Sequence, residues 1–303
     1  FVITDVSYER HNSDRSLDLY NPSTGQGAMT DRFIADRGAM LLWRLQFEQR
    51  GARDDNDDPR AGPKPFNEDW DTTTVQGNWD YVDLDPTHAL PGGQPLTLAI
   101  DGDGVSLHDH QVVFGSSQGE SIEGEGESDW LYGMGGDDTI EGQAGNDYIE
   151  GGSGNDVLYG GAGRDDVHGG EGDDVLVGAT GAMNGDNLYG GLGFDTYYFA
   201  GGAEQNGILD LDGRGTVYHG GFQLTGASGT LSAGGGQAVY ESPYYTYHHV
   251  PAGNGVVRSG LMIYSGGSAD EGGANEHIVT IIDWRNGELG ITLTASGSSA
   301  GSG

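Results

Sequence analysis

The chain has 303 residues, of which 47 are acidic and 13 are basic, so its formal net charge is −34 at pH 7. This charge repels phosphate backbones and anionic lipid surfaces, which argues against nucleic acid or acidic membranes as partners and favours divalent cations. The chain contains 58 glycines and no cysteine, so no disulfide stabilises it. We expect no transmembrane helix, because no apolar stretch is long enough, and the given sequence shows no signal-peptide pattern. We expect the chain to be part of a larger polypeptide.

Residues 1–52 are predicted to form a helix-containing segment, which we interpret as the tail of a larger upstream domain. The run TDRFIADRGAMLLWRLQFEQRG offers Thr30 or Asp31 as an N-cap, carries a Leu41/Leu45 apolar stripe and stops at Gly51. The apolar stripe of this helix needs a partner surface.

Residues 53–77 are acidic, contain several prolines and are predicted to form a long loop. The aspartates within residues 54–58 either bind an ion or form a solvated charge run. Residues 78–114 contain the strand-like runs WDYVDL, PLTLAI and HQVVFG, and we expect them to form a β-rich cap on the element that follows.

A nine-residue unit of the form G-G-x-G-x-D-x-U-x, where U is apolar, repeats through residues 115–199, and GGSGNDVLY is one of its best copies. With one twelve-residue exception, the aspartates are nine residues apart, at Asp129, Asp138, Asp147, Asp156, Asp165, Asp174, Asp186 and Asp195. The apolar positions keep the same spacing, at Leu131, Ile140, Ile149, Leu158, Val167, Leu176, Leu188 and Tyr197. The segment GSSQGESIE is a degenerate first copy, with Glu120 in place of Asp and Ile122 in place of U. A disordered glycine-rich linker would show no such phase between Asp and U.

The repeat predicts a mainly β fold. The glycines of each unit can turn with positive φ, and the x-U-x half can extend as a strand. Two units then make an eighteen-residue coil, and alternate copies stack into two short parallel sheets whose U side chains meet inside. One apolar residue per strand buries only about 1.5–3 kcal/mol. This is small beside a backbone ordering cost of about 1–2 kcal/mol per residue.

Something besides the core must therefore hold the turns together. The Asp of each unit lies at a turn, beside backbone carbonyls that glycine leaves accessible, and stacking brings such oxygens together from adjacent coils. Hard oxygen ligands in a flexible ring suit Ca²⁺. We therefore expect several calcium ions to be the cofactor.

These residues resemble the RTX (repeat-in-toxin, haemolysin-type) calcium-binding repeats of proteins exported by bacterial type I secretion. The resemblance implies a right-handed parallel β-roll with one calcium ion per turn. The expected fold adds to it the predicted β-rich caps and the one N-terminal helix. It also implies that each repeat Asp gives its carboxylate, and that the first Gly and the third residue of each turn give carbonyls. The implied glycine ligands are Gly133, Gly142, Gly151, Gly160 and Gly169. The pattern is broken by Glu120, by Glu125 and Glu127 in place of glycines, and by the longer turn of residues 178–184, so calcium sites are in doubt there.

Residues 200–294 are predicted to form a β-rich C-terminal cap, and residues 295–303 a Gly/Ser-rich linker. Asn286-Gly287 suits a type I′ turn, which predicts a hairpin between HIVTIIDW and LGITLT. The order of FDTYYF, DLDGRG and IIDWRNGELGITL resembles the β-rich segment that closes the repeat block in many haemolysin-type proteins.

Several smaller motifs have a functional and a structural interpretation. Gly115 to Gly119 matches G-x-S-x-G, but a β-roll repeat follows instead of a helix, so we do not expect Ser117 to be a nucleophile. His108 and His110 lack a third ligand at metal spacing, and no HExxH motif occurs. The runs Asp101 to Gly104 and Asp210 to Gly213 resemble fragments of calcium loops without the distal Glu of an EF-hand.

The run YESPYYTYHH, Tyr240 to His249, either stacks on a glycan or peptide or forms an ordinary strand with half its rings buried.

The sequence thus predicts a calcium-binding region without an active site of its own, from a secreted or cell-surface bacterial protein. Its expected partners are calcium, the rest of a larger polypeptide and the type I secretion machinery. Two alternatives remain open. Residues 1–50 resemble the closing part of the hydrolase domain that precedes RTX repeats in some lipase-like proteins, so the catalytic residues of a secreted hydrolase could lie upstream. The chain could also be an adhesin segment that binds glycan or peptide.

Overall fold

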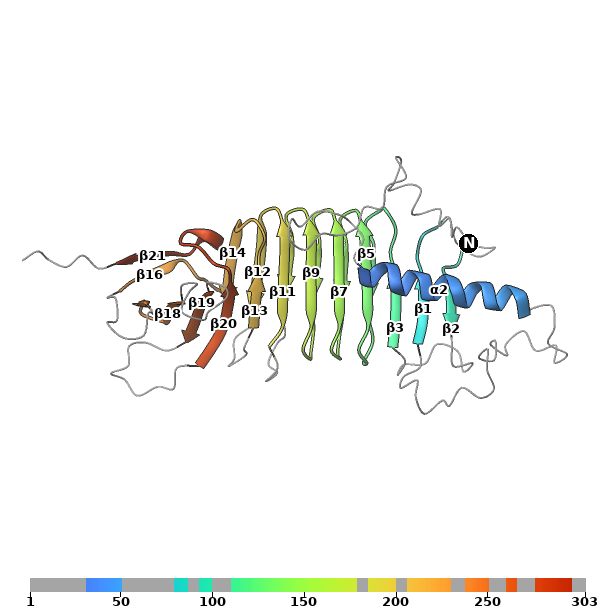
Figure 1. The fold of residues 1–303 in the computed structure, drawn as a ribbon, viewed down its shortest axis with the longest axis horizontal. Helices are drawn as coiled ribbons and strands as arrows, with labels where there is room; N and C mark the ends of the chain where they lie inside the picture. The colour runs from blue at the N-terminus through green and yellow to red at the C-terminus, as the bar shows by residue number, and fades with distance from the viewer. Residues whose placement is uncertain are drawn as a thin grey trace, which may run out of the picture.

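A computed structural model describes residues 31–50, 79–86, 93–99, 110–178, 185–199, 206–229, 238–250, 260–265 and 276–295. Its strands stack along the long axis of an elongated molecule (Figure 1) and form one 14-stranded and one 7-stranded sheet. The predicted acidic loop, the run Asp101 to Gly104, His108, and the final linker from residue 296 lie outside the described residues.

The larger sheet contains every second repeat of the array. Its parallel strands along the roll are β3 (His110–Phe114), β5 (Trp130–Gly135), β7 (Tyr148–Ser153), β9 (Asp166–Glu171), β11 (Asn187–Leu192) and β13 (Asn206–Leu209), of which β3 and β13 flank the predicted repeats. Leu131 pairs with Ile149, Ile149 with Val167, and Val167 with Leu188. The U residues of alternate repeats therefore lie in register, as the nine-residue spacing predicts.

The remaining repeats form the smaller sheet. Its strands are β4 (Ser121–Glu123), β6 (Thr139–Glu141), β8 (Val157–Tyr159), β10 (Val175–Val177), β12 (Asp195–Phe199), β14 (Gly215–His219) and β15 (Phe222–Gln223). All pairs are parallel except β14 with β15. Ile122 pairs with Ile140, which confirms that GSSQGESIE continues the array.

One continuous core lies between the two sheets. The U residues from Leu131 to Tyr197 have no exposed surface, and Ile208 and Val217 extend the same core beyond the predicted repeats. Glycines bring successive turns into backbone contact. At Gly163 φ is +149°, and an added Cβ would overlap the carbonyl oxygen of Gly145 in the preceding coil. The mainly β roll predicted from the repeat is thus confirmed.

Two strands and a helix extend the N-terminal end. Strands β1 (Trp79–Asp83) and β2 (Leu96–Ala99) continue the larger sheet next to β3, so the three predicted strand runs are confirmed. The predicted helix is α2 (Asp31–Arg50). It lies on the outer face of the larger sheet (Figure 1), where Phe33 and Met40 pack against Phe114 and Tyr132. The helix face that contacts the sheet therefore carries Phe33 and Met40, whereas the side chain of Leu45 from the predicted Leu41/Leu45 stripe lies outside the described residues.

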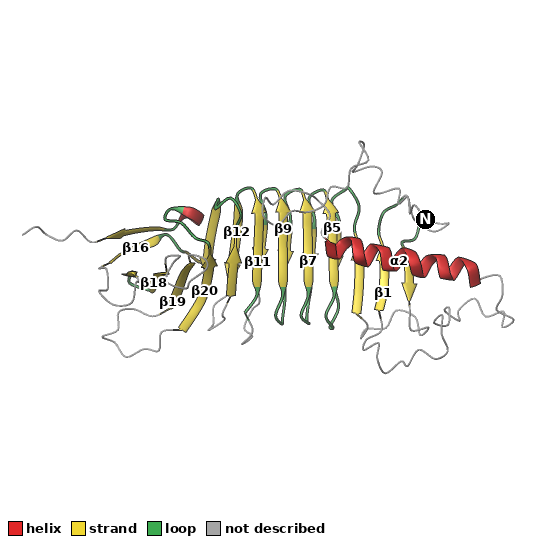
Figure 2. Ribbon diagram, viewed as in Figure 1, coloured by secondary structure: helices red, strands yellow, loops and turns green. Residues whose placement is uncertain are grey.

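The C-terminal strands extend the larger sheet from β13 onward. They are β16 (Gly226–Gly229), β17 (Ala238–Glu241), β18 (Tyr245–Val250), β19 (Gly260–Ser265), β20 (Glu276–Ile282) and β21 (Thr292–Ala295). β20 pairs with β13 and with β19, and β17 to β20 form an antiparallel meander. Figure 2 shows these strands turned away from the direction of the roll.

The predicted hairpin at Asn286-Gly287 is wrong, because β20 and β21 do not pair. Instead a short 3-10 helix, η2 (Glu288–Gly290), follows the turn, and β21 pairs with β16. The side chain of Asn286 holds this arrangement: its Oδ1 accepts from Leu293 N–H at 2.7 Å, and its Nδ2 donates to the Leu293 carbonyl at 3.0 Å. Trp284 and Leu289 are buried in the core at this point.

Among the residues that the structure describes, no helix is long and apolar enough to cross a membrane.

Candidate metal centre

The repeat aspartates form two buried rows, one along each edge of the roll. Each of them is at most 2% exposed. One row contains Asp129, Asp147, Asp165 and Asp186, and the other contains Asp138, Asp156, Asp174 and Asp195. Each Asp stands at or immediately before the start of a strand, where the glycine turn ends. The structure therefore brings together the aspartates that the sequence spacing singled out.

One carboxylate oxygen of each Asp links neighbouring coils. The Asp129 N–H donates to Asp147 Oδ1 at 2.8 Å, and the Asp138 N–H donates to Asp156 Oδ1 at 2.8 Å. The same bond recurs at Asp147, Asp156, Asp165 and Asp174, whose N–H groups donate to the next Asp of the row. Each row is thus a ladder of backbone donors and carboxylate acceptors.

The other carboxylate oxygen has no hydrogen-bond partner. Oδ2 is buried and without a donor in Asp138, Asp147, Asp156, Asp165, Asp174 and Asp195. A buried polar atom left unpaired costs about 1–3 kcal/mol, and more when it is charged. Six such atoms at equivalent positions of one array indicate a place where a cation completes the site.

Backbone carbonyls converge on the same oxygens. A Cβ added to Gly142 would lie under 3.0 Å from both Asp147 Oδ2 and the carbonyl oxygen of Gly160. At Gly133 the corresponding atoms are Asp138 Oδ2 and the Gly151 carbonyl, and at Gly151 they are Asp156 Oδ2 and the Gly169 carbonyl. The position that a side chain would occupy is therefore bounded by one carboxylate oxygen and one carbonyl oxygen of the next coil.

Burial controls the protonation of these carboxylates. It raises the pKa of Asp147 and Asp195 to about 8, of Asp138 and Asp174 to about 7, and of Asp156 and Asp165 to about 6. The backbone N–H bond lowers the pKa of Asp147, and the charges of Asp165 and Asp129 raise it again. A divalent cation beside Oδ2 would favour the ionised form instead.

The donor set fits calcium. Carboxylate and carbonyl oxygens are hard ligands, and Ca²⁺ accepts many of them in irregular geometry. Each described turn offers an Asp Oδ2 and a backbone carbonyl oxygen, and within the described ranges no group of three or more acidic, histidine or cysteine side chains is placed for a metal.

Comparison with known families agrees with this geometry. Residues 114–149 and 142–176 match the RTX calcium-binding nonapeptide repeat (4 copies). The chain contains a calcium-binding RTX region. No curated protein matches the chain. The coils after residue 176 keep the register of the matched RTX repeats, because β10 pairs with β12 and β9 with β11.

The first RTX turns differ from the central ones. The Glu125 N–H donates to Asp129 Oδ2 at 2.7 Å, so both carboxylate oxygens of Asp129 accept backbone bonds. The longer side chain of Glu120 bends back to accept from Ser116 N–H at 3.1 Å and from the Ser116 hydroxyl. Neither residue presents the unpaired oxygen of the central repeats.

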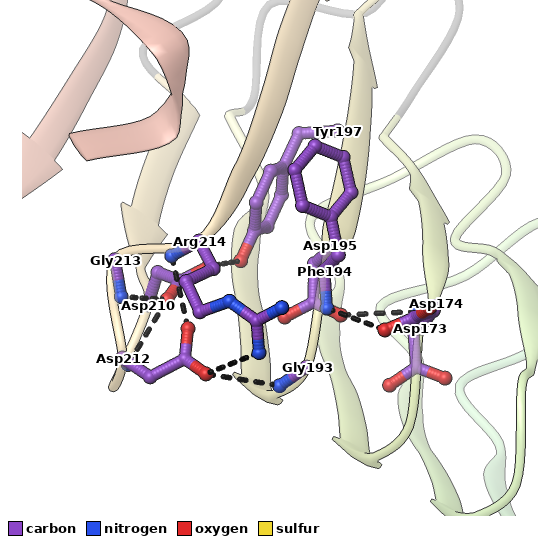
Figure 3. Close-up of polar contacts among 10 residues, drawn as sticks. All are labelled: Asp173, Asp174, Gly193, Phe194, Asp195, Tyr197, Asp210, Asp212, Gly213 and Arg214. Atoms are coloured by element: carbon purple, nitrogen blue, oxygen red, sulfur yellow. Dashed lines mark hydrogen bonds and ion pairs between the residues drawn. The ribbon is translucent and has the colours of Figure 1, made fainter. Parts of the chain in front are cut away.

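The last RTX turn is closed by a polar network (Figure 3). The Tyr197 hydroxyl donates to Asp210 Oδ2 at 2.7 Å, and Asp210 Oδ1 accepts from Gly213 N–H at 2.6 Å. Asp212 Oδ2 accepts from Gly193 N–H at 3.2 Å and lies 3.8 Å from Arg214 Nη1. The carboxylates of Asp210 and Asp212 thus accept hydrogen bonds both from their own turn, at Gly213, and from the roll, at Tyr197 and Gly193.

Two polar features of the array were missed from the sequence. Asn206 takes the Asp position of the next coil, and its Oδ1 accepts from Asp186 N–H at 3.0 Å. A second ladder runs through residues that directly precede several of the repeat aspartates: Asn155 N–H donates to Asp137 Oδ1, and Asp173 N–H donates to Asn155 Oδ1, each at 2.8 Å. The recurring Asn or Asp at this position was a signal that could have revealed the second ladder.

The other candidate residues do not form a shared site. Ser117 is exposed in the bend between β3 and β4, and no helix follows it. His110 Nδ1 lies 2.7 Å from the Ser128 carbonyl oxygen. In the tyrosine run, Tyr247 is buried, Tyr240 and Tyr245 pack against the core, and Tyr244 is 72% exposed. The rings of this run therefore face in different directions instead of forming one platform.

Proposed function

We propose that this chain is a calcium-dependent folding region of a secreted or cell-surface bacterial protein, which passes unfolded through the type I secretion machinery and folds outside the cell. The observation that carries the proposal is the set of six buried aspartate Oδ2 atoms without a partner, each at a glycine turn. In their calcium-free form these atoms oppose folding, and a bound cation removes that cost.

The proposed mechanism is linkage between binding and folding. Calcium that binds the folded coil and not the expanded chain adds RT ln(1 + [L]/Kd) per site, about 2.7 kcal/mol at a hundredfold excess over Kd. Without calcium, a net charge of −34 favours an expanded chain. The low calcium of a cytoplasm would then keep the chain unfolded for export, and the higher calcium outside would fold it.

We also propose that the described region has no catalytic role. Ser117, at the centre of the G-x-S-x-G match from Gly115 to Gly119, lies in a bend that starts a repeat, without the strand-to-helix turn that exposes a nucleophile. On this proposal the chain hydrolyses neither short esters nor peptides at any calcium concentration.

Calcium binding to two matched variants tests the proposal. Asp156→Asn removes one unpaired carboxylate oxygen from a central turn, whereas Asp129→Asn alters a carboxylate whose oxygens already accept backbone bonds. Equilibrium dialysis should show that Asp156→Asn binds fewer calcium ions than the parent and folds at a higher calcium midpoint, with a smaller effect for Asp129→Asn. Equal stoichiometry and midpoints in all three proteins would reject the assignment of Oδ2 as a calcium ligand.

A further inference from the structure

Helix α2 contacts two kinds of strand, those of the RTX repeats and those that precede them. Its N-terminal end lies at β5, where Arg32 also reaches β7, and from there the helix runs past β3 and β1 toward β2 (Figure 1). The helix thus connects the first coils of the roll with the N-terminal extension of the larger sheet.

The contacts with the repeat strands are specific. The Arg32 guanidinium carbon lies 4.2 Å from the ring centroid of Trp130 in β5 and 4.1 Å from that of Tyr148 in β7. These are cation–π distances. Phe33 meets the ring of Tyr132 edge-on at 5.4 Å, and the Tyr132 hydroxyl donates to Asp36 Oδ2. Trp130 and Tyr148 directly follow the repeat aspartates Asp129 and Asp147 in the sequence.

The contacts with the preceding strands are buried. Arg37 Nη2 lies 2.7 Å from Asp83 Oδ2, and the two side chains are 9% and 2% exposed. Phe33 also meets Phe114 of β3 edge-on at 5.6 Å. Withdrawing one partner of a buried ion pair strongly destabilises the fold, because the other charge is left buried and unpaired. The helix therefore docks as a unit, with its contacts to β5 and β7 and its contacts to β1 and β3 formed together.

This surface exists only when β5 and β7 are paired in register, because Arg32 contacts rings from both strands. We propose that α2 is a calcium-dependent docking helix: it packs on the sheet when calcium has ordered the first coils, and so reports the calcium state of the roll to the chain on its N-terminal side. The inference rests on the proposed function. By reciprocity of linkage, docking of α2 must also strengthen calcium binding in those coils.

Hydrogen–deuterium exchange of the full chain during a calcium titration tests the docking helix. Amides of residues 32–41 should exchange freely in chelator and gain protection at the calcium midpoint of β7. Protection of these amides in chelator, or their free exchange at saturating calcium while β7 and β12 are protected, would overturn the inference and leave the proposed function standing. Equal protection of β7 and β12 with and without calcium would instead overturn the proposed function.

Variants of the helix separate docking from helix formation. Phe33→Asp should abolish protection of residues 32–41 and raise the calcium midpoint of β7 about fivefold or more, with a smaller change at the distant β12. Ala35→Asp introduces the same residue at an exposed position of the helix and should leave the protection of residues 32–41 and the calcium midpoint of β7 unchanged. Arg32→Ala, which keeps the buried rings, should shift the β7 midpoint in the same direction as Phe33→Asp. Unchanged β7 midpoints in both Phe33→Asp and Arg32→Ala would contradict the coupling.

Discussion

Asp147 shows how one residue serves the fold and the proposed calcium site together. Its Oδ1 accepts the N–H of Asp129 in the neighbouring coil, which fixes the carboxylate. Its Oδ2 has no donor, and both Oδ2 and the carbonyl oxygen of Gly160 lie under 3.0 Å from the position that a Cβ on Gly142 would occupy. Two oxygens of one side chain thus have different roles, and the glycine at the start of the repeat is what leaves room for the second.

A glycine substitution tests that role at the residue scale. Gly142→Ala would place a methyl group under 3.0 Å from Asp147 Oδ2 and the Gly160 carbonyl, although its φ lies outside the left-handed region. We expect a higher calcium midpoint and a loss of about 1–3 kcal/mol in calcium-loaded stability, from steric conflict at the site. Urea unfolding in calcium measures this.

The matched control for this change is Gly126→Ala, because a Cβ at Gly126 has no atom within 4 Å. It should leave the calcium midpoint close to that of the parent. If both alanine variants behaved alike, the space at Gly142 would not be part of a calcium site.

The two aspartate rows make the repeat strands sensitive to pH at the scale of the element. Burial raises the pKa values of the central aspartates to about 6 to 8, above the ordinary value of 3.8. Between these values the folded, calcium-free coil holds more protons than the unfolded chain, so its stability falls as the pH rises. Calcium must displace those protons, and its apparent affinity should therefore rise over the same range.

Circular dichroism in excess EDTA at pH 5 and pH 8 measures the first effect. We expect more β structure at pH 5 than at pH 8. In calcium the preference should reverse, with a lower calcium midpoint at pH 8. β structure in EDTA that increased with pH would show that the buried carboxylates are not protonated in the folded coil.

The same elements show what the sequence could predict. The spacing of Asp and U was sufficient to predict both sheets, their register and the core from Leu131 to Tyr197, because each coil repeats its neighbour. The partner of α2 could not be predicted, since Tyr132 faces outward at a position where the repeat pattern allows any residue, and Phe114 lies just before the first repeat. At Asn286 a local turn signal was correct, but the strand that β21 joins depends on distant residues.

For the whole molecule, the two ends of the roll differ from its middle. At the N-terminal end, the Glu120 carboxylate accepts from the Ser116 N–H, and the Glu125 N–H donates to Asp129 Oδ2. These turns therefore lack the unpaired carboxylate oxygen of the central turns. At the C-terminal end, Tyr197 and Asp210 form a hydrogen bond beside the last Asp of the row. Between them the structure repeats one incomplete oxygen site along its axis. In a chain of charge −34 without cysteines, a cation bound along this array would contribute to folding.

The most direct test of this account is the far-UV circular dichroism of the chain at neutral pH, recorded in excess EDTA and again after calcium is added. We predict a largely unfolded spectrum in EDTA and a cooperative gain of β structure with calcium, because the unpaired carboxylate oxygens oppose folding until cations bind them. An unchanged spectrum in excess EDTA would contradict the claim that calcium binding and folding are coupled.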